Sequence, residues 1–209
     1  MDAALLSTLR SNPSLGREPF DEMVAGMRSD LAEVRYERFR PDLLQYCYRV
    51  AGTVGEMLLP VLGLVEEDEE RAREPAVAFG MAVQLINIVR DVRPDVALGR
   101  IYLPKEEMRR FGVSECDVLE GRFSPEYRKL IRLQARRGEA LLRRAERSIP
   151  ELPAGVRLLV ATLIALYREL LVELRARDYN NLEGDRISVP TLKKLLLTCS
   201  TALRLLGGR

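Results

Sequence analysis

Residues 84–95 read QLINIVRDVRPD, and both the fold class and the candidate site depend on this stretch. Gln84, Asn87, Asp91 and Asp95 are separated by three, four and four positions, which places their side chains on one face of an α-helix. Such a polar face is most often the solvated side of an amphipathic helix. Here apolar residues occupy most of the remaining positions, which predicts a buried helix whose polar groups need partners.

The chemistry of this face suits a divalent cation and an anionic ligand. Carboxylates such as Asp91 and Asp95 are ligands of hard cations, and Mg²⁺ commonly takes one or two of them together with waters and substrate phosphates. The amides of Gln84 and Asn87 can hydrogen-bond the oxygens of a ligand. A DxxxD pair alone is a weak signal. The combined pattern QxxNxxRDxxxD is much stronger, because amides, an arginine and two acids align.

Pro94 raises the question of whether this helix reaches Asp95. Proline lacks the N–H that would bond the carbonyl of Arg90, and its ring disfavours helical angles at Arg93. Helix geometry is therefore expected to hold through Asp91. We expect Asp95 to join the polar face only if the helix kinks here and does not stop.

The rest of the chain has the same helical periodicity and shows no convincing strand alternation. With 209 residues, 47% of them hydrophobic and 31% charged, the chain is long enough for one sizeable core. We predict a single all-α domain over residues 1–209. The expected helices span about 2–11, 19–31, 41–62, 66–91 or beyond, 124–148, 155–179 and 189–206.

Composition excludes several classes of chemistry. The sequence has no histidine, so a Ser-His-Asp triad, a Cys-His pair and a His-ligated zinc are ruled out. The formal net charge of +2 does not indicate nucleic-acid binding. Cys47, Cys116 and Cys199 lack CxxC spacing and are expected to be reduced thiols of an intracellular protein.

No membrane-spanning or targeting segment is expected from the sequence. The N-terminus lacks the basic and apolar regions of a signal peptide. The most apolar run, residues 158–166, is about half of the ~20 residues that a bilayer-spanning helix needs.

Small residues recur in two of the expected helices. Gly52 and Gly55 lie within YCYRVAGTVG, and Gly80 precedes Gln84. Each glycine inside a helix costs about 1 kcal/mol relative to alanine, so these positions need a reason. Close helix packing and a cavity that accommodates a ligand are both compatible with the pattern. Composition alone favours packing.

Two arginines flank the acidic pair. Arg90 and Arg100 are candidates for holding phosphate oxygens with their guanidinium forks. The alternative is that both are surface arginines paired with nearby acids.

Two segments carry a family resemblance. YCYRVAGTVG (46–55) and QLINIVRDVRPDVALGRIYLP (84–104) resemble the signature pair of the squalene/phytoene synthases. The wider sequence, including PFDEMVAGMRSDL, ALYRELLVEL and RARDYNN, is similar to phytoene synthases of plants, algae and cyanobacteria. The resemblance covers essentially the whole chain and implies an isoprenoid-synthase-type helical bundle around a deep cavity.

The resemblance also implies a reaction. It is the head-to-head condensation of two geranylgeranyl diphosphates to phytoene through prephytoene diphosphate, in carotenoid biosynthesis, without NADPH. Mg²⁺ ions, or Mn²⁺ in their place, are held by two aspartate-rich motifs and assist departure of the diphosphate. The implied location is the plastid, peripheral to a membrane, or the cytoplasm of a bacterial source, with association to other carotenoid enzymes.

Matching positions carry the family's roles onto this sequence. The metal and catalytic residues would be Asp91 and Asp95, with Arg90 also catalytic. The residues lining the diphosphate site or the tail cavity would be Gln84, Asn87, Arg100, Tyr46, Val50, Gly52 and Tyr167.

Two departures from the family pattern bear on activity. The first aspartate-rich motif and the first helices of the family fold are expected upstream of these 209 residues. Arg93 and Pro94 replace the usual Gly-Glu between the aspartates. A prenyltransferase is therefore weighed against a non-catalytic shortened homologue that binds isoprenoid diphosphates or assists carotenoid enzymes. A helical interaction domain without a ligand is disfavoured by the retained polar face.

The last expected helix offers a membrane contact. It combines Lys193, Lys194 and Arg204 with five leucines, and could lie on an anionic lipid surface. Packing onto the body of the protein as the final helix is at least as well supported.

Overall fold

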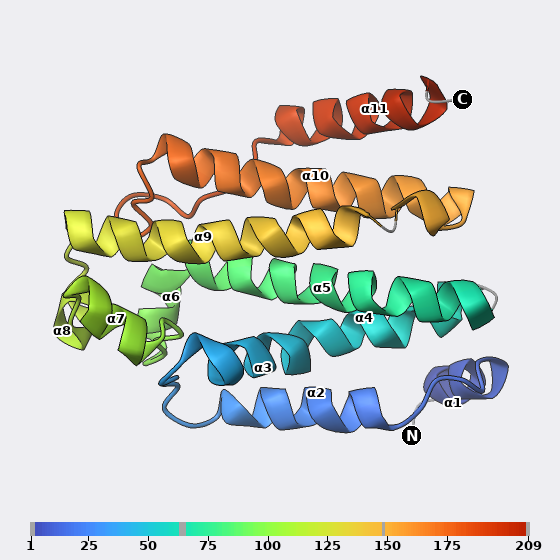
Figure 1. Cartoon of the computed structure of the whole chain (residues 1–209), viewed down its shortest axis with the longest axis horizontal. Coiled ribbons are helices and arrows are strands. Elements are labelled where there is room, and N and C mark those ends of the chain that lie inside the picture. Colours follow the sequence, from blue (N-terminus) through green and yellow to red (C-terminus); the bar gives the residue numbers. More distant parts are fainter. Residues whose placement is uncertain (1–2, 63–65, 148, 208–209) are drawn as a thin grey trace.

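The molecule is built from helices, as the periodicity predicted (Figure 1). The computed structural model describes residues 3–62, 66–147 and 149–207. Over these ranges the only pairing of extended backbone is an isolated parallel bridge between Arg35 and Ile101. No helix in them combines the length and apolar character needed to cross a bilayer.

The long helices lie side by side in chain order, with one layer contacting the next. The most extensive contact joins α5 to α9. The order across the molecule is α2 (Glu18–Ser29), the run from α3 (Leu44–Cys47) to α4 (Thr53–Leu58), α5 (Glu66–Arg90), α9 (Pro125–Glu146), α10 (Ala154–Ala176) and α11 (Thr191–Gly207).

The shorter elements complete this stack. One group gathers at the end of the bundle where α5 stops, and it consists of α6 (Val92–Ala97), α7 (Lys105–Phe111) and α8 (Glu115–Leu119). The others are α1 (Ala3–Ser11), the π turns η1 (Phe39–Leu43) and η2 (Tyr48–Gly52), and the 3₁₀ turns η3 (Pro60–Leu62) and η4 (Ile149–Glu151).

The glycines bring helix backbones into direct contact. A Cβ on Gly80 would lie 2.0 Å from the carbonyl oxygen of Ala51, and one on Gly55 would lie 2.4 Å from that of Ala76. Only glycine permits such an approach. The glycines therefore serve close packing of η2 and α4 on α5, the favoured of the two explanations.

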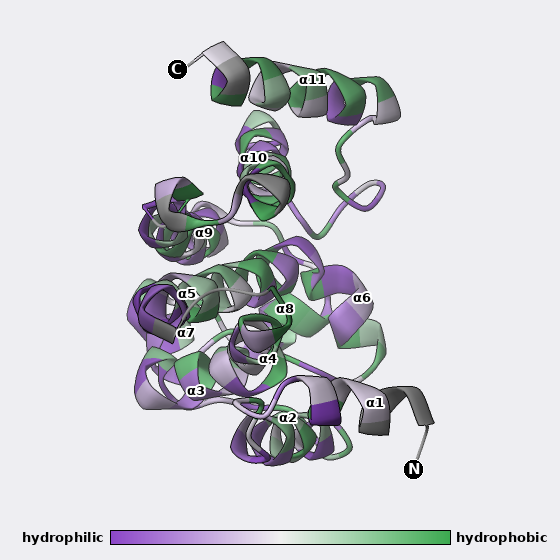
Figure 2. Ribbon diagram, turned by 90° about the vertical axis from the view of Figure 1, so that its right-hand side faces the viewer, coloured by the Kyte–Doolittle hydropathy of each residue, from purple (hydrophilic) through white to green (hydrophobic). Residues whose placement is uncertain are grey.

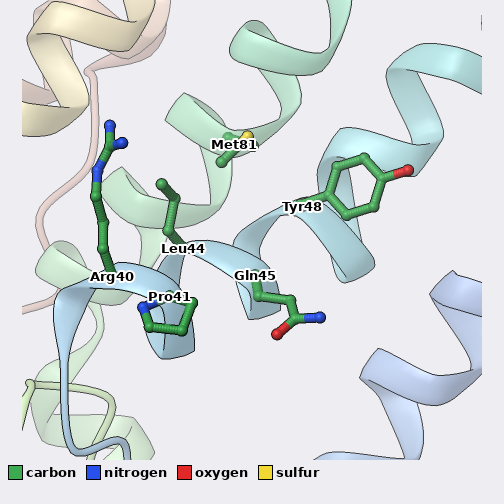
Figure 3. A pocket seen from close by; sticks show the side chains of 6 residues that line it. All are labelled: Arg40, Pro41, Leu44, Gln45, Tyr48 and Met81. Atoms are coloured by element: carbon green, nitrogen blue, oxygen red, sulfur yellow. The ribbon is translucent and has the colours of Figure 1, made fainter.

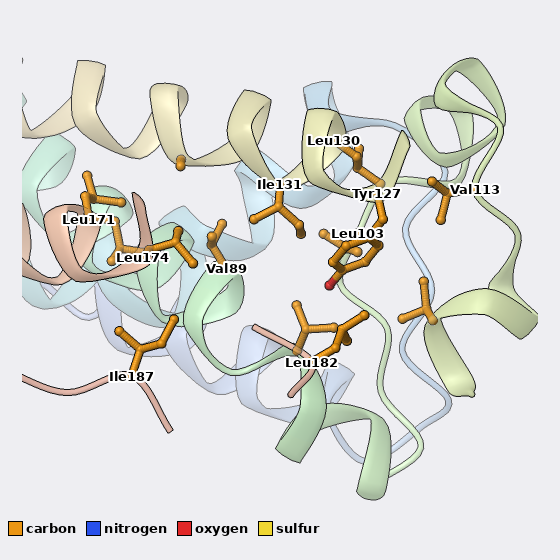
Figure 4. Close-up of a cluster of buried hydrophobic side chains, with 14 of the residues drawn as sticks. Val89, Leu103, Val113, Tyr127, Leu130, Ile131, Leu171, Leu174, Leu182 and Ile187 are labelled. Atoms are coloured by element: carbon orange, nitrogen blue, oxygen red, sulfur yellow. The ribbon is translucent and has the colours of Figure 1, made fainter. Parts of the chain in front are cut away.

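The largest apolar cluster fills the space between α5, α9 and α10. Tyr127 and Ile131 of α9 are fully buried in it. Leu182 and Ile187, from the segment that joins α10 to α11, point into the same cluster (Figure 4). The core thereby fixes this connecting segment on both sides of residues 183–186.

Several helix limits differ from the expected ones. Helix α5 ends at Arg90. Helix α10 ends at Ala176 and not near residue 179, because Asp178 and Tyr179 have positive φ angles of 53° and 63°. Helix α11 begins at Thr191. Residues 2 and 148, expected as helix limits, lie outside the described ranges.

Candidate functional site

The helix kinks at Asp91, and the chain turns on into α6. Asp91 has φ −105° and ψ 21°, outside helical values, while its N–H still donates to the carbonyl of Asn87 at 2.8 Å. The N–H of Asp95 donates to the carbonyl of Asp91 at 2.9 Å, so the turn between the two acids survives. Pro94 is the third residue of α6, in the first turn, where a missing N–H leaves no bond unmade.

Two arginines hold the carboxylate of Asp91. Arg90 donates from Nε to Oδ1 at 2.9 Å and also from Nη2 to Oδ2. Arg186 donates from Nε to Oδ1 and from Nη2 to Oδ2, both at 2.7 Å. Burial raises the pKa of Asp91, but the hydrogen bonds from Arg186 and Arg90 outweigh it and lower the pKa to about 2.

Asp95 has the opposite environment. Burial is the largest cause that raises its pKa to about 6, and the charge of Asp91 adds to this while Arg100 opposes it. Within the described part of the chain no hydrogen bond reaches the Asp95 carboxylate. One member of the acidic pair is thus fully engaged, and the other is open to a ligand.

The amides of α5 complete the face. Asn87 and Gln84 are both half-buried, one and two helical turns before Asp91. Oδ1 of Asn87 is buried without a hydrogen-bond partner, although buried polar atoms are normally satisfied. An oxygen kept free at this position suits a cation or a ligand donor.

The oxygen atoms of Asn87, Asp91 and Asp95 fit the chemistry of a hard divalent cation such as Mg²⁺. Among the residues that the structure describes, no group of three or more His, Cys, Asp or Glu side chains forms a metal site by itself. A cation held here would complete its shell with water and with oxygens of the substrate.

A third aspartate, which sequence reasoning left unassigned, joins this end of the molecule. Asp30 accepts hydrogen bonds from the hydroxyls of Tyr46 and Tyr102, each at 2.9 Å. Its backbone carbonyl accepts from Arg100 at 3.0 Å, and its charge raises the pKa of Asp95. No spacing rule points to Asp30, because its partners are far away in the sequence.

Tyr46 lies in this tyrosine cluster. Its ring stacks on that of Tyr102 with centroids 5.1 Å apart, and the ring of Tyr36 lies 5.4 Å from that of Tyr46 and 6.2 Å from that of Tyr102. Burial, followed by the hydrogen bond with Tyr102, raises the pKa of Tyr46. The phenol therefore stays protonated and acts as a donor.

The other matched residues lie in packed positions. Val50 is half-buried against α2, where a Cβ on Gly26 would lie 2.8 Å from it. Gly52 faces Met81 and Val77 of α5, which a Cβ at Gly52 would meet at 3.3 Å. Both shape the packing of η2 and do not contact the acidic face.

An apolar cavity of about 130 Å³ lies between α4, α5, α9 and α10. Phe79 and Leu163 are among its lining residues. The ring of Phe79 makes an edge-to-face contact with Tyr167, one turn beyond Leu163, with centroids 6.3 Å apart. From Phe79 to Asp91 is twelve residues, about 18 Å along a helix, so Tyr167 stands between the apolar cavity and the acidic end.

A wider groove of about 610 Å³ occurs elsewhere (Figure 3). It is lined by Arg40, Pro41, Leu44, Gln45, Tyr48 and Met81. Met81 is six residues before Asn87, about 120° around the helix. The groove is therefore on a different face of α5 from the acidic pair.

The fold and this site define a class of protein. It is the all-α isoprenoid-synthase type, a helical bundle that here carries a polar helix face at one end and an apolar cavity further along the same helix. The model of the squalene/phytoene synthase family matches residues 1–193. The chain belongs to the squalene/phytoene synthase family.

Particular relatives agree with this assignment. The chain is 43% identical over 207 residues to phytoene synthase 3, chloroplastic, of Zea mays, covering 98% of this chain and 48% of that protein. It is 40% identical over 214 residues to a phytoene synthase of Arthrospira platensis, covering 98% and 68%. The chain thus spans about half the length of the plant relatives it matches.

The solved structures give the same result. A dehydrosqualene synthase in complex with a ligand superimposes with a TM-score of 0.86 and 34% identity, covering 98% of this chain and 70% of that one. The fold is therefore shared with a solved dehydrosqualene synthase.

Proposed function

We propose that this chain carries the second aspartate-rich half of a phytoene synthase, which condenses two geranylgeranyl diphosphates head to head to phytoene. The observation that carries the proposal is the free Asn87 Oδ1 beside Asp91 and Asp95, at the polar end of a bundle related to phytoene synthases. The reaction passes through prephytoene diphosphate and uses no NADPH.

Each part of the site has a role in this proposal. Asn87, Asp91 and Asp95 would hold Mg²⁺, or Mn²⁺ in its place, which would supply Lewis-acid assistance to a departing diphosphate. Gln84 and Arg100 orient the diphosphate oxygens, while the apolar cavity excludes water from the isoprenoid tails.

The test is turnover of geranylgeranyl diphosphate with Mg²⁺, with phytoene measured by chromatography and diphosphate release measured in parallel. Asp95→Asn is expected to lower turnover by about a hundredfold, because it removes a metal ligand. Asp68→Asn is the matched control, since Asp68 is a partly exposed acid near the start of α5, about five turns of helix before Asn87. Absence of phytoene from the unmodified chain would refute catalysis by these 209 residues.

A non-catalytic role is the second candidate. It is favoured by Asp91, whose carboxylate is already engaged by two arginines. In this role the chain binds isoprenoid diphosphates or assists other carotenoid enzymes. Saturable binding of geranylgeranyl diphosphate without phytoene formation would support it.

We further propose peripheral contact with an anionic membrane through α11, in a plastid or in the cytoplasm of a bacterial source. Helix α11 lies at one edge of the molecule, beyond α10 (Figure 2). Its sequence contains no acidic residue. The outer stripe, four leucines that are 60–69% exposed, consists of Leu192, Leu195, Leu196 and Leu203.

The charges of α11 are divided between its two faces. Lys193 is turned toward α10, where it pairs with Glu169 and Glu173. Lys194 is exposed beside the outer stripe and would add about 1 kcal/mol at an anionic surface. Arg204 lies on the side of α11 that faces α10, where it donates to the hydroxyl of the buried Thr201 at 3.3 Å. Leu195→Glu is expected to abolish co-sedimentation with phosphatidylglycerol vesicles, and Leu119→Glu on α8 to leave it unchanged. Equal binding by both variants would exclude α11 as the contact.

A further inference from the structure

Asp91 has no free acceptor site for a cation. A carboxylate offers about four lone-pair positions, and Arg90 and Arg186 together donate four hydrogen bonds to it. Any divalent cation that binds Asp91 must first displace one of these donors.

The two arginines differ in how firmly they are held. The side chain of Arg90 is 16% exposed, whereas that of Arg186 is 63% exposed. Arg90 is also the last residue of α5 and adjoins Asp91 in the chain. Arg186 reaches Asp91 from the segment between α10 and α11 and is therefore the donor that can leave.

The backbone that carries Arg186 stays in place when its side chain moves. Ile187 and Leu182 are buried in the core on either side. Asn181 donates to the carbonyl of Val89 at 2.5 Å, next to the kink of α5, and accepts from the Tyr127 hydroxyl at 2.8 Å. The main chain is thus anchored on both sides of residues 183–186, and the exposed guanidinium of Arg186 can move without displacing these anchors.

We propose that Arg186 is a latch on Asp91 that is released when a cation and a diphosphate bind together. Without a ligand, its fork occupies the Asp91 oxygens and suppresses cation binding. When the cation takes Asp91, the same fork is released beside the diphosphate, whose oxygens match its geometry as well as a carboxylate does. This inference rests on the proposed cation site and makes Arg186 a positioning residue for both ligands.

The latch predicts effects of opposite sign for one substitution. In the absence of diphosphate, Arg186→Gln is expected to bind Mn²⁺ about tenfold more tightly than the unmodified chain, because the competing guanidinium is gone. With inorganic diphosphate present, the same variant is expected to bind Mn²⁺ about tenfold more weakly, because the fork that holds the anion is missing.

The measurement is Mn²⁺ titration followed by electron paramagnetic resonance, with and without inorganic diphosphate, and it needs no turnover. Arg186→Lys keeps the positive charge but lacks the planar guanidinium, so its Mn²⁺ affinity should lie between those of the unmodified chain and Arg186→Gln. Arg144→Gln, which removes an exposed arginine paired with Glu74, is the control and should change neither affinity. Thermal melting of each variant confirms that it is folded.

The latch is overturned if Arg186→Gln leaves Mn²⁺ affinity unchanged or weakened without diphosphate. That outcome differs from failure of the proposed function, in which Mn²⁺ binding follows the predicted pattern but geranylgeranyl diphosphate is not converted. If no form of the chain binds Mn²⁺ in a manner abolished by Asp91→Asn, the cation site and the latch are both refuted.

Discussion

Asp91 and Asp95, one helical turn apart, have carboxyl groups whose pKa values are displaced in opposite directions, to about 2 and about 6. The kink at Asp91 turns its carboxylate into the forks of Arg90 and Arg186. Asp95 sits in the next turn and is half-buried, where the charges of Asp91 and Asp30 raise its pKa and those of Arg100 and Arg186 oppose them. Pairs of acids separated in this way commonly take different roles in a site.

The raised pKa of the Asp95 carboxyl should be visible in the pH dependence of stability. Its pKa is raised on folding, so its favourable contribution is complete below a pH near 3.8 and is lost as the pH rises through about 6. Asp95→Asn should therefore be more stable than the unmodified chain at pH 7 and equal to it below pH 4. Thermal melting across this range checks the difference, and equal melting temperatures at pH 7 would contradict the raised pKa.

Asp91 should affect the pH dependence of stability in the opposite direction. Its pKa is lowered on folding, so its stabilising effect is present above a pH near 3.8 and is lost as the pH falls toward 2. Asp91→Asn leaves the poorly exposed Arg90 without its partner, and should lower the free energy of unfolding at pH 7 by about 1–3 kcal/mol. Urea unfolding of Asp91→Asn and of the control Asp68→Asn measures this loss. A loss no larger than in the control would contradict the stabilising role of the hydrogen bonds from Arg90 and Arg186 to Asp91.

Gly80 should resist substitution. An added Cβ would lie 2.0 Å from the carbonyl oxygen of Ala51, so α5 and η2 must separate, at a cost of about 1–3 kcal/mol. Gly16→Ala is the control, because nothing lies within 4 Å of that Cβ, and its effect should stay within about 0.5 kcal/mol. Similar unfolding free energies for the two variants would show that the helices are not in backbone contact.

Tyr127 should hold the segment that carries Arg186. Tyr127→Phe removes the hydroxyl that donates to Asn181 and leaves a buried acceptor unpaired, at a cost of about 1–3 kcal/mol. Hydrogen exchange is expected to accelerate in residues 180–189 more than in α9. Uniform exchange along the chain would mean that this hydrogen bond does not fix the segment.

The helical class, the polar face and the consequence of Pro94 could all be predicted from the sequence. Each depends on contacts within a few residues, where the helical period of 3.6 determines which side chains lie together. The Asp95 N–H bond to the Asp91 carbonyl shows that the turn between the two acids survives the kink. The expected end of the helix at Asp91 or beyond was wrong by a residue, because the backbone angles change at Asp91 itself.

The partners of the site depended on tertiary structure. Arg186 meets Asp91 across 95 residues, and Asp30 meets Tyr102 across 72. No local period can encode either contact, because packing of α2, α5 and the segment after α10 decides it. The sequence by itself determined which groups lie on one face of α5. Only the folded bundle decided that Asp91 is clamped by two arginines while Asp95 is left open, since long-range packing determines burial and charge partners.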